Sequence, residues 1–535
     1  MGDYLNPGSK NFIYSLNSKI YVDKTDLIRC TNAYLGTQQR YMCVSRPRRF
    51  GKTMGLDMLA AYYSAGTDSH GLFRDLKISR DPSYEQHINR YDVIRINIQE
   101  FVSMASSVED FLSLLSKYMV ADLTEAYEVT VKFRDRDNLI QTLKDTANAT
   151  GRQFVFLFDE WDCLFREYKE DTEAQKKYLD FLRLLLKDQQ YVALAYMTGI
   201  LPVKKYGTHS ALNMFTEFSM TDPRELAPYF GFTEDEVRTL CSDYGMSFEE
   251  ARSWYDGYEL SYTEDAGGKA VERACSVYSP KSMVDAMLTH HFGPYWNRTE
   301  TYEALKIYIQ LNYDGLKECV IRMLSGDHVP VDTGTFTNDM TTFSRADDVL
   351  SLLIHLGYLN YDRKTGTVSV PNREVAIEYV NAIQTMDGWG EVMRSLNESK
   401  ALVTALITQD AEAVAEGIDR VHDSVSILTY NDENSLSCTI QFAFFFAQEY
   451  YTIIRELPSG KGFADICLIP RRLYVDKPAV IIELKKEQTA EGAIAQIREK
   501  RYTGAVMEYK DNLLLCGINY DKKKKHTCVI ERYKG

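Results

Sequence analysis

The chain has ten cysteines among 535 residues, yet no two of them have Cys-x-x-Cys spacing. Scattered cysteines within apolar runs behave as small hydrophobes, so a zinc ribbon or a dithiol redox centre is not expected. No apolar run approaches the ~18 residues that a membrane-spanning helix needs. The first residues also lack the basic and apolar regions of a signal peptide. We therefore expect a cytoplasmic protein with no membrane partner.

The sequence also lacks the positive charge of a nucleic-acid coat, with 62 basic against 76 acidic residues and a net charge of −14. This balance excludes a whole-molecule coat but leaves room for a local basic groove. The nine histidines include one adjacent pair, His290-His291, with no third ligand nearby in the sequence. No Ser-His-Asp or Cys-His constellation can be assembled from local motifs. The chemistry must therefore be carried by other residue types.

The length suggests three or four domains. Short apolar runs alternate with stretches of helical periodicity from Arg40 to about Thr221. This alternation is typical of an α/β fold with a mostly parallel sheet. The predicted strands are Tyr41–Ser45, Asp92–Ile98, Phe154–Phe158 and Val192–Met197.

The pattern changes after Pro223, where we expect the strands to stop and helices to follow. Between Ser344 and Ala376 a helix ending at Gly357 precedes two short alternating strands, an order typical of a winged helix. A last αβ unit begins near Asn431. The predicted domains are an α/β domain with a parallel sheet, a helical subdomain, a winged-helix-like segment, a helical connector and a C-terminal αβ domain; they span residues 1–222, 223–334, 335–385, 386–430 and 431–535.

The segment Ser45-Arg-Pro-Arg-Arg-Phe-Gly-Lys-Thr53 follows a predicted strand and precedes a predicted helix. This context suits a phosphate loop, because backbone N–H groups and the helix N-terminus face the anion. Lys52 would reach the β- and γ-phosphates, and the Thr53 hydroxyl would hold Mg²⁺. The remaining predicted nucleotide contacts of this loop come from Arg49, Phe50 and Gly51. Gly-Lys-Thr alone is more often a surface turn than a nucleotide site, so a second motif must decide.

The second motif is Phe154-Val-Phe-Leu-Phe-Asp-Glu160, an apolar strand that ends in two carboxylates. Asp159 would hold Mg²⁺, and Glu160 would polarise the attacking water. The alternative is an ordinary strand that runs into an acidic helix cap at Asp162. Both motifs in this order favour a nucleotide site.

Three further positions are less specific. Thr198 closes another strand and would sense the γ-phosphate, although a polar strand end is an equally good interpretation. Arg46 and its neighbours in the loop would contact phosphate or remain solvated. Arg224 is a candidate for an arginine supplied to a neighbouring subunit's site, and a homo-oligomer is left open.

The last domain contains Asp465 on one predicted strand and Glu483-Leu-Lys485 on the next. Alternation along a strand places Glu483 and Lys485 on one face. Two carboxylates, with the Leu484 carbonyl, would bind Mg²⁺, and Lys485 would orient water or stabilise developing charge. Beyond Pro470 the chain carries 15 basic and 9 acidic residues, which suits a phosphate backbone. The alternative is an exposed strand with solvated charges.

These motifs resemble a family of bacterial AAA-ATPase-like proteins whose members carry a C-terminal PD-(D/E)XK nuclease domain. The resemblance covers nearly the whole chain, and its most specific part is the Arg-Pro-Arg-Arg-Phe-Gly-Lys string. The matching segments are Tyr21–Thr25, Ser45–Thr53, Phe158–Glu160, Met197–Ile200, Trp254–Tyr258 and Val277–Pro280.

The resemblance implies that Asp159 and Glu160 are the Walker B pair and that Tyr21–Thr25 lie near the adenine or the base of the loop. It also implies that Arg46 in place of the first glycine is the family's own pattern. In the last domain, the resemblance implies that two further residues belong to the nuclease site with Asp465, Glu483 and Lys485. They are Glu433, as a metal ligand, and Gln496. The Pro-Asp dipeptide is absent, because Ala464 precedes Asp465.

The leading hypothesis is an ATPase whose nucleotide state controls a Mg²⁺-dependent nuclease acting on DNA or RNA. Its cofactors would be ATP and Mg²⁺, and its partner nucleic acid. The alternative is an ATP-gated scaffold or signalling switch with a non-cleaving nuclease-like domain.

Overall fold

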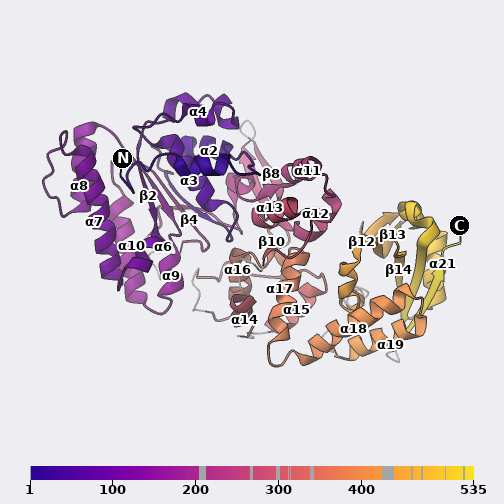
Figure 1. Cartoon of the computed structure of the whole chain (residues 1–535). Helices are drawn as coiled ribbons and strands as arrows, with labels where there is room; N and C mark the ends of the chain where they lie inside the picture. The colour runs from indigo at the N-terminus through magenta and orange to yellow at the C-terminus, as the bar shows by residue number, and fades with distance from the viewer. Residues whose placement is uncertain are drawn as a thin grey trace. The chain divides into compact units, whose positions relative to one another are not determined.

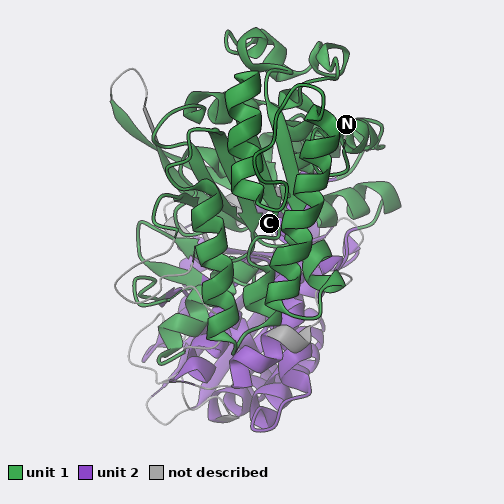
Figure 2. Cartoon of the chain, turned by 90° about the vertical axis from the view of Figure 1, so that its left-hand side faces the viewer, with its two compact units in different colours: residues 1–246, 256–291, 330–368 green, residues 247–255, 292–329, 369–535 purple. Residues whose placement is uncertain are grey.

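The computed structural model forms two compact units, each discontinuous in sequence (Figure 2). Unit 1 comprises residues 1–246, 256–291 and 330–368, and unit 2 comprises residues 247–255, 292–329 and 369–535. The structure describes residues 2–203, 212–265, 269–296, 302–310, 313, 315–337, 343–424, 439–459, 462–471, 474–500, 502–521 and 525–534.

Unit 1 is built on a five-stranded sheet of order β2-β3-β4-β1-β5 (Figure 1). All of its neighbouring strands are parallel. The strands are β1 (Tyr41–Ser45), β2 (Asp92–Asn97), β3 (Phe154–Asp159), β4 (Val192–Gly199) and β5 (Thr216–Phe218). The parallel α/β fold predicted for this region is therefore confirmed. The first four strands lie where the sequence predicts them, whereas the short β5 at the sheet edge was not predicted.

Helices cover both faces of this sheet, as parallel strands buried on both sides require. Along β3 the side chains alternate, so that Phe154, Phe156 and Phe158 face one core while Val155 and Leu157 face the other. The first core includes residues of α6 (Ile98–Met104), α7 (Val108–Tyr127), α8 (Leu139–Thr150), α9 (Cys163–Glu167) and α10 (Thr172–Leu186). The second includes residues of α1 (Lys10–Leu16), α2 (Asp26–Tyr34), α3 (Lys52–Tyr63), α4 (His70–Phe73), η1 (Lys77–Arg80) and α5 (Tyr84–His87).

Strands continue beyond Pro223, which corrects the expectation that they stop there. A three-stranded sheet of order β6-β8-β7 is antiparallel throughout. Its long strands alternate polar and apolar residues too weakly to be recognised, because much of β8 is exposed. The elements after β5 are η2 (Arg224–Tyr229), β6 (Phe232–Thr233), α11 (Glu234–Asp243), α12 (Phe248–Tyr255), β7 (Tyr258–Asp265), β8 (Ala270–Tyr278) and α13 (Pro280–Thr289).

The predicted helix and hairpin near residue 350 are present. The helix α16 (Ala346–Leu356) ends at Gly357, whose φ of 86° is the left-handed conformation that favours glycine. The strands β10 (Asn360–Asp362) and β11 (Thr367–Ser369) follow and form a small sheet with β9 (Val329–Pro330). The helices of unit 2 that precede its last sheet include α14 (Tyr302–Gln310), α15 (Leu316–Leu324), α17 (Arg373–Gln384), α18 (Gly390–Ile407) and α19 (Ala411–Ser424).

Unit 2 ends in a mixed five-stranded sheet of order β12-β13-β14-β15-β16. Only β14 and β15 are parallel, and α21 (Ala490–Glu499) lies in the connection between them. Ile494 and Ile497 of α21 pack onto Ile481 of β14 and Leu515 of β15. The remaining elements are η4 (Phe445–Glu449), β12 (Tyr451–Ser459), β13 (Gly462–Pro470), β14 (Ala479–Lys486), η6 (Tyr502–Asn512), β15 (Leu513–Tyr520) and β16 (His526–Arg532).

Candidate nucleotide and metal sites

The loop between β1 and α3 has the backbone shape of an anion cradle. Gly51 caps α3 with a φ of 91°, and a side chain in that conformation would be strained. Arg49 has a φ of 63° although it carries a side chain. Such backbone conformations persist only where the surroundings hold them. The loop therefore turns sharply enough to present the N-terminus of α3 to an anion.

Lys52 is buried, with 5% of its surface exposed. Its Nζ donates hydrogen bonds to the carbonyl oxygens of Arg46 (3.0 Å) and Pro47 (2.9 Å) within the loop. Burial lowers the pKa of Lys52, while the carboxylates of Glu160, Asp162 and Asp159 act in the opposite direction. The ammonium group is thus held inside the loop and close to carboxylates, where a phosphate could replace the carbonyl oxygens as its partner.

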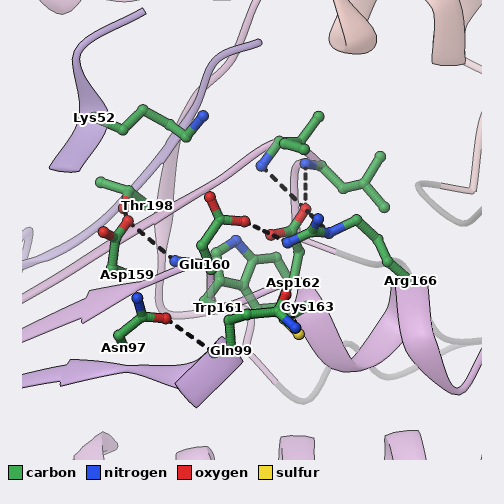
Figure 3. Close-up of polar contacts among 12 residues, drawn as sticks. Lys52, Asn97, Gln99, Asp159, Glu160, Trp161, Asp162, Cys163, Arg166 and Thr198 are labelled. Carbon is green, nitrogen blue, oxygen red and sulfur yellow. Dashed lines mark hydrogen bonds and ion pairs between the residues drawn. The ribbon is translucent and has the colours of Figure 1, made fainter. Parts of the chain in front are cut away.

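Asp159 connects the loop to β4. The Thr53 hydroxyl donates to Asp159 Oδ2 (2.7 Å), and the Thr198 hydroxyl donates to Asp159 Oδ1 (2.6 Å). The strand order explains this convergence: β4 lies between β1 and β3, so its end lies between the loop and Asp159. Figure 3 shows Asp159 and Thr198 in contact, with Lys52 nearby. The structure therefore brings together Lys52, Thr53, Asp159 and Thr198 as the sequence predicts.

Glu160 has a partner that the sequence did not reveal. Its carboxylate pairs with the guanidinium of Arg166 on α9 (Figure 3). Arg166 Nε also lies 3.7 Å from Asp162 Oδ2. Glu160 itself has a φ of 53°, a left-handed conformation that is costly for a residue with a side chain. The sequence indicates the position of Arg166 only through its i,i+4 spacing from Asp162, and this spacing is too common to identify an ion pair.

Asp162 does not cap α9 with its side chain. Instead its Oδ2 accepts hydrogen bonds from the backbone N–H of Ile200 (3.0 Å) and Leu201 (2.9 Å). Trp161 and Asp162 pack against Gly199, where an added Cβ would lie 2.7 Å from Asp162 Oδ1 and 2.8 Å from the Trp161 ring. The Met197–Ile200 motif needs glycine for this reason. The residues that follow β3 therefore hold the end of β4 in place through these contacts.

Two loop residues serve the fold. Arg46 is fully buried, and its Nη1 donates to the carbonyl oxygens of Ser45 and Phe218, both at 2.8 Å. Burial lowers the pKa of Arg46 to about 10. The ring of Phe50 is buried edge-on against Tyr258, with centroids 5.4 Å apart. The alternative that Arg46 is solvated is therefore wrong, while its phosphate contact stays a prediction, and Phe50 can offer a ligand only its backbone.

The structure shows the contacts of two other sequence features of unit 1, the Tyr21–Thr25 motif and Arg224, whose proposed roles stay predictions. In the Tyr21–Thr25 motif, Lys24 Nζ forms an ion pair with Glu236 (2.5 Å), and Asp23 Oδ1 accepts from the Thr25 hydroxyl (2.6 Å). Arg224 is exposed and pairs with Asp222 (3.2 Å).

In unit 2, Asp465 and Glu483 come from the antiparallel strands β13 and β14. The paired register runs from Leu468↔Val480 to Ile466↔Ile482. Asp465 follows where this ladder stops, and its Oδ2 accepts the backbone N–H of Leu484 (2.7 Å). The Asp465 carboxylate thus accepts a backbone hydrogen bond of β14 that a neighbouring strand would otherwise accept. This contact with Leu484 keeps it next to Glu483.

Glu483 is 2% exposed and lies against Lys485 and Gln496. Lys485 Nζ is 3.4 Å from Glu483 Oε1 and 2.6 Å from Gln496 Oε1, and Gln496 Nε2 donates to Glu483 Oε1. Burial and then the charge of Asp465 raise the pKa of Glu483 to about 7. The structure therefore gathers Asp465, Glu483, Lys485 and Gln496, as the sequence predicts.

One atom of this cluster fits a cation. Glu483 Oε2 is buried and has no hydrogen-bond partner among the described residues. A divalent ion would satisfy this oxygen and neutralise the two adjacent carboxylates, which suits the oxygen ligands that Mg²⁺ prefers. Within the described part of the chain no group of three or more His, Cys, Asp or Glu side chains has metal-binding geometry. The third predicted carboxylate, Glu433, lies outside the described residues.

Among the described residues, no helix has both the length and the apolar composition needed to cross a bilayer. In the segment Trp254–Tyr258, the side chains of Trp254, Tyr255 and Tyr258 are buried.

Comparison with known proteins gives two family matches. Residues 11–208 match a family model described as "Predicted AAA-ATPase", and residues 432–530 match the PD-(D/E)XK nuclease superfamily. A curated relative is an uncharacterized protein in the vnfD 5′ region of Azotobacter chroococcum mcd 1, 27% identical over 290 residues. The match covers 52% of this chain and 51% of that relative, so the chain spans about half the length of the curated relative it matches.

Solved structures with partial similarity come from two archaea. Cdc6p from Pyrobaculum aerophilum is 11% identical, with a TM-score of 0.26 and coverage of 70% of this chain and 98% of that one. The Aeropyrum pernix ORC1 protein, solved in complex with DNA, is 13% identical, with a TM-score of 0.24 and coverage of 71% and 97%. At these scores the similarity supports no inference about function. The two family matches, together with the parallel sheet of unit 1 and the mixed sheet of unit 2, show that the chain combines an AAA-ATPase-like domain with a C-terminal domain of the PD-(D/E)XK nuclease superfamily.

Proposed function

We propose that the chain binds and hydrolyses ATP at the loop of unit 1, and that its nucleotide state controls a Mg²⁺-dependent nuclease site in unit 2. The observation that carries this proposal is the presence of two separate constellations suited to phosphate chemistry. One gathers Lys52, Thr53 and Asp159 around a phosphate loop, and the other gathers Asp465 and Glu483 beside a lysine.

In unit 1, the backbone of Arg49, Phe50 and Gly51 and the ammonium group of Lys52 would hold the nucleotide phosphates. Thr53 and Asp159 would hold the accompanying Mg²⁺, which neutralises phosphate charge when bound. Thr198 already donates to Asp159 and would orient that carboxylate or contact the γ-phosphate. Glu160 would accept a proton from the attacking water once its carboxylate leaves Arg166.

In unit 2, Asp465, Glu483 and the Leu484 carbonyl would hold Mg²⁺, with Glu433 as a further proposed ligand. The bound ion would polarise a phosphodiester and lower the pKa of an attacking water. Lys485, which contacts Glu483 and Gln496, would stabilise charge that develops on phosphate. The proposed substrate is DNA or RNA, and the proposed location is the cytoplasm, in accord with the free thiols of the nine described cysteines.

The test combines nucleotide hydrolysis and cleavage on the full chain. Purified wild type, Lys52→Ala and Glu483→Gln are incubated with Mg²⁺ and with single- and double-stranded DNA and RNA. We expect Lys52→Ala to lose ATP binding and Glu483→Gln to lose cleavage by 10²-fold or more while it still hydrolyses ATP.

A matched control is Lys317→Ala, which removes a lysine whose contacts among the described residues are with the Gly388 carbonyl and the Trp389 ring. It should hydrolyse ATP and cleave like wild type. ATP turnover without cleavage of any substrate would instead favour an ATP-gated scaffold.

A further inference from the structure

Two arginines of unit 2 flank one tryptophan. The guanidinium of Arg373 lies 3.9 Å from the centroid of the Trp254 ring, and that of Arg471 lies 5.6 Å from the same centroid. We call Arg373, Trp254 and Arg471 the arginine–tryptophan cluster. Trp254 comes from α12, Arg373 is the first residue of α17, and Arg471 directly follows β13, the strand that carries Asp465. The cluster thus joins the nuclease sheet to two helices of the same unit.

The cluster has no counterion among the described residues. Neither Arg373 nor Arg471 forms an ion pair with a described carboxylate. Glu449 favours the charged form of Arg373, and Glu250 favours that of Arg471, but neither carboxylate is within ion-pair distance. The carboxylate of Glu374, next to Arg373 in sequence, instead accepts the backbone N–H groups of Tyr295 (2.5 Å) and Trp296 (2.6 Å).

Donors of both guanidinium groups remain available. Arg471 is 5% exposed and uses Nε on the Tyr451 carbonyl (3.3 Å) and Nη2 on the Ser253 hydroxyl (2.8 Å), which leaves Nη1 without a described partner. Arg373 has no hydrogen bond to any described residue. Arg373 is half-buried, so part of its side chain is exposed. An anion can therefore approach the donors of Arg373, with Arg471 beside them.

The electrostatics favour such an anion. Burial and the adjacent positive charge of Arg471 lower the pKa of Arg373 to about 9. The N-terminus of the 12-residue helix α17 adds partial positive charge at the same place. Two like charges held together without a counterion repel each other, and a bound phosphate would relieve this repulsion. Guanidinium groups bind phosphate with two parallel hydrogen bonds, which makes phosphate the best-fitting anion.

Aromatic side chains line the neighbouring surface. Tyr450 and Tyr474 pack edge-on with ring centroids 5.1 Å apart, and Lys477 lies 4.5 Å from the Tyr450 ring. Tyr474 is close enough to influence the charge of both arginines. Cationic groups interleaved with aromatic rings are suited to the backbone and bases of a nucleic-acid strand.

We propose that the arginine–tryptophan cluster is a second contact for nucleic acid, which binds a backbone phosphate of the strand presented to Asp465 and Glu483. Arg471 comes six positions after Asp465 along the extended chain, or about 20 Å at 3.4 Å per residue. That length corresponds to about six nucleotides of a duplex strand. The cluster therefore holds the substrate away from the cut and carries no part of the bond cleavage. This inference rests on the proposed nuclease substrate.

Binding to a fluorescein-labelled 30-nucleotide DNA strand tests this site. Fluorescence anisotropy is measured with the full chain in a Glu483→Gln background, at several NaCl concentrations, so that no cleavage occurs. Arg373→Gln should raise the Kd about five- to tenfold and reduce the slope of log K against log salt by about one. Arg373 has no described hydrogen bond, so its replacement should leave the fold intact.

The matched control is Arg394→Gln, which removes an exposed arginine of α18 in the same unit. It should bind within twofold of the Glu483→Gln parent. If Arg373→Gln binds as tightly as Arg394→Gln, the cluster is not a nucleic-acid contact. Inorganic phosphate separates a free anion from a backbone phosphate: it should displace the strand no better than NaCl of equal ionic strength. Displacement at submillimolar phosphate would assign the cluster to a free anion and overturn the proposal.

The outcomes separate this inference from the proposed function. A wild-type chain that binds DNA through Arg373 but never cleaves any nucleic acid contradicts the nuclease and leaves the contact standing. A wild-type chain that cleaves, together with an Arg373→Gln variant that binds and cleaves normally, contradicts the contact alone.

Discussion

At the scale of single residues, a few hydrogen bonds and ion pairs determine the arrangement of the candidate nucleotide site. Asp159 accepts hydrogen bonds from the hydroxyl groups of both Thr53 and Thr198, so its carboxylate is held between the loop and β4. Glu160 is fixed differently, by the guanidinium of Arg166. Lys52, Asp159 and Glu160 could be predicted because their motifs follow apolar strands. Arg166 could not, because no local pattern distinguishes a helix arginine that turns inward from one that faces solvent.

Arg166 should therefore matter more for stability than an ordinary surface arginine. Its side chain is 11% exposed and faces the carboxylates of Glu160 and Asp162, of which Asp162 is fully buried. Arg166→Ala removes the guanidinium that pairs with both carboxylates, which we expect to cost about 3 kcal/mol in the free energy of unfolding.

The comparison is Arg238→Ala, which breaks an exposed i,i+4 pair with Glu234 on α11. That loss should be below about 1 kcal/mol. Denaturant unfolding of unit 1, followed by the fluorescence of the buried Trp161, measures both. Equal losses in the two variants would show that the Arg166 pairs contribute no more than a surface ion pair.

At the scale of secondary structure elements, the sequence predicts those elements whose apolar period is strong. The strands β1 to β4 are continuous apolar runs, and α3 begins at the lysine of the loop, so their positions were evident. The hairpin β7–β8 was missed because its exposed residues hide the alternation. Contacts between elements, such as that of α21 with β15, were not predictable because they depend on residues distant in sequence.

The contact between α21 and β15 depends on Gly517. A Cβ atom at this position would lie 2.2 Å from the Ala490 carbonyl oxygen and 3.0 Å from the Ala493 Cβ. Gly517→Ala should push α21 away from the sheet and destabilise unit 2 by about 2 kcal/mol. Because α21 also carries Gln496, the variant should cleave nucleic acid more slowly.

Gly390→Ala provides the control, since a Cβ there meets no atom within 4 Å. Thermal unfolding should show a lowered melting temperature for Gly517→Ala only. Unchanged melting in both variants would mean that the helix can shift at no cost.

The helix α16 carries a histidine that should make stability depend on pH. His355 is 3% exposed, and burial and then the charge of Arg46 lower its pKa to about 3. Below pH 6.5 the unfolded chain binds a proton here that the folded chain does not, so stability is lost as the pH falls. The expected loss from this group is about 2 kcal/mol between pH 6.5 and pH 5.

His355→Leu should remove this part of the pH dependence while it retains the apolar packing against Phe336. Denaturant unfolding at pH 7.5 and pH 5 measures the difference. A wild type and a variant with identical losses would contradict a buried neutral histidine.

At the scale of the whole molecule, one chain carries two proposed phosphate-handling sites in two compact units. The two family matches cover these sites, and they span residues 11–208 and 432–530. The sequence predicted both end domains and the helix and hairpin in the middle. It did not predict that the compact units are discontinuous, because that depends on long-range packing of segments such as α12 and α17.

The central claim is that nucleotide at Lys52 controls cleavage at Glu483. The most direct test measures the rate of nucleic-acid cleavage by the full chain in Mg²⁺, with and without ATP, for wild type and Lys52→Ala. We predict that ATP changes the rate of the wild type at least fivefold and leaves the rate of Lys52→Ala unchanged. A wild type that cleaves at one rate whatever the nucleotide, with Lys52→Ala cleaving at that same rate, would contradict the account.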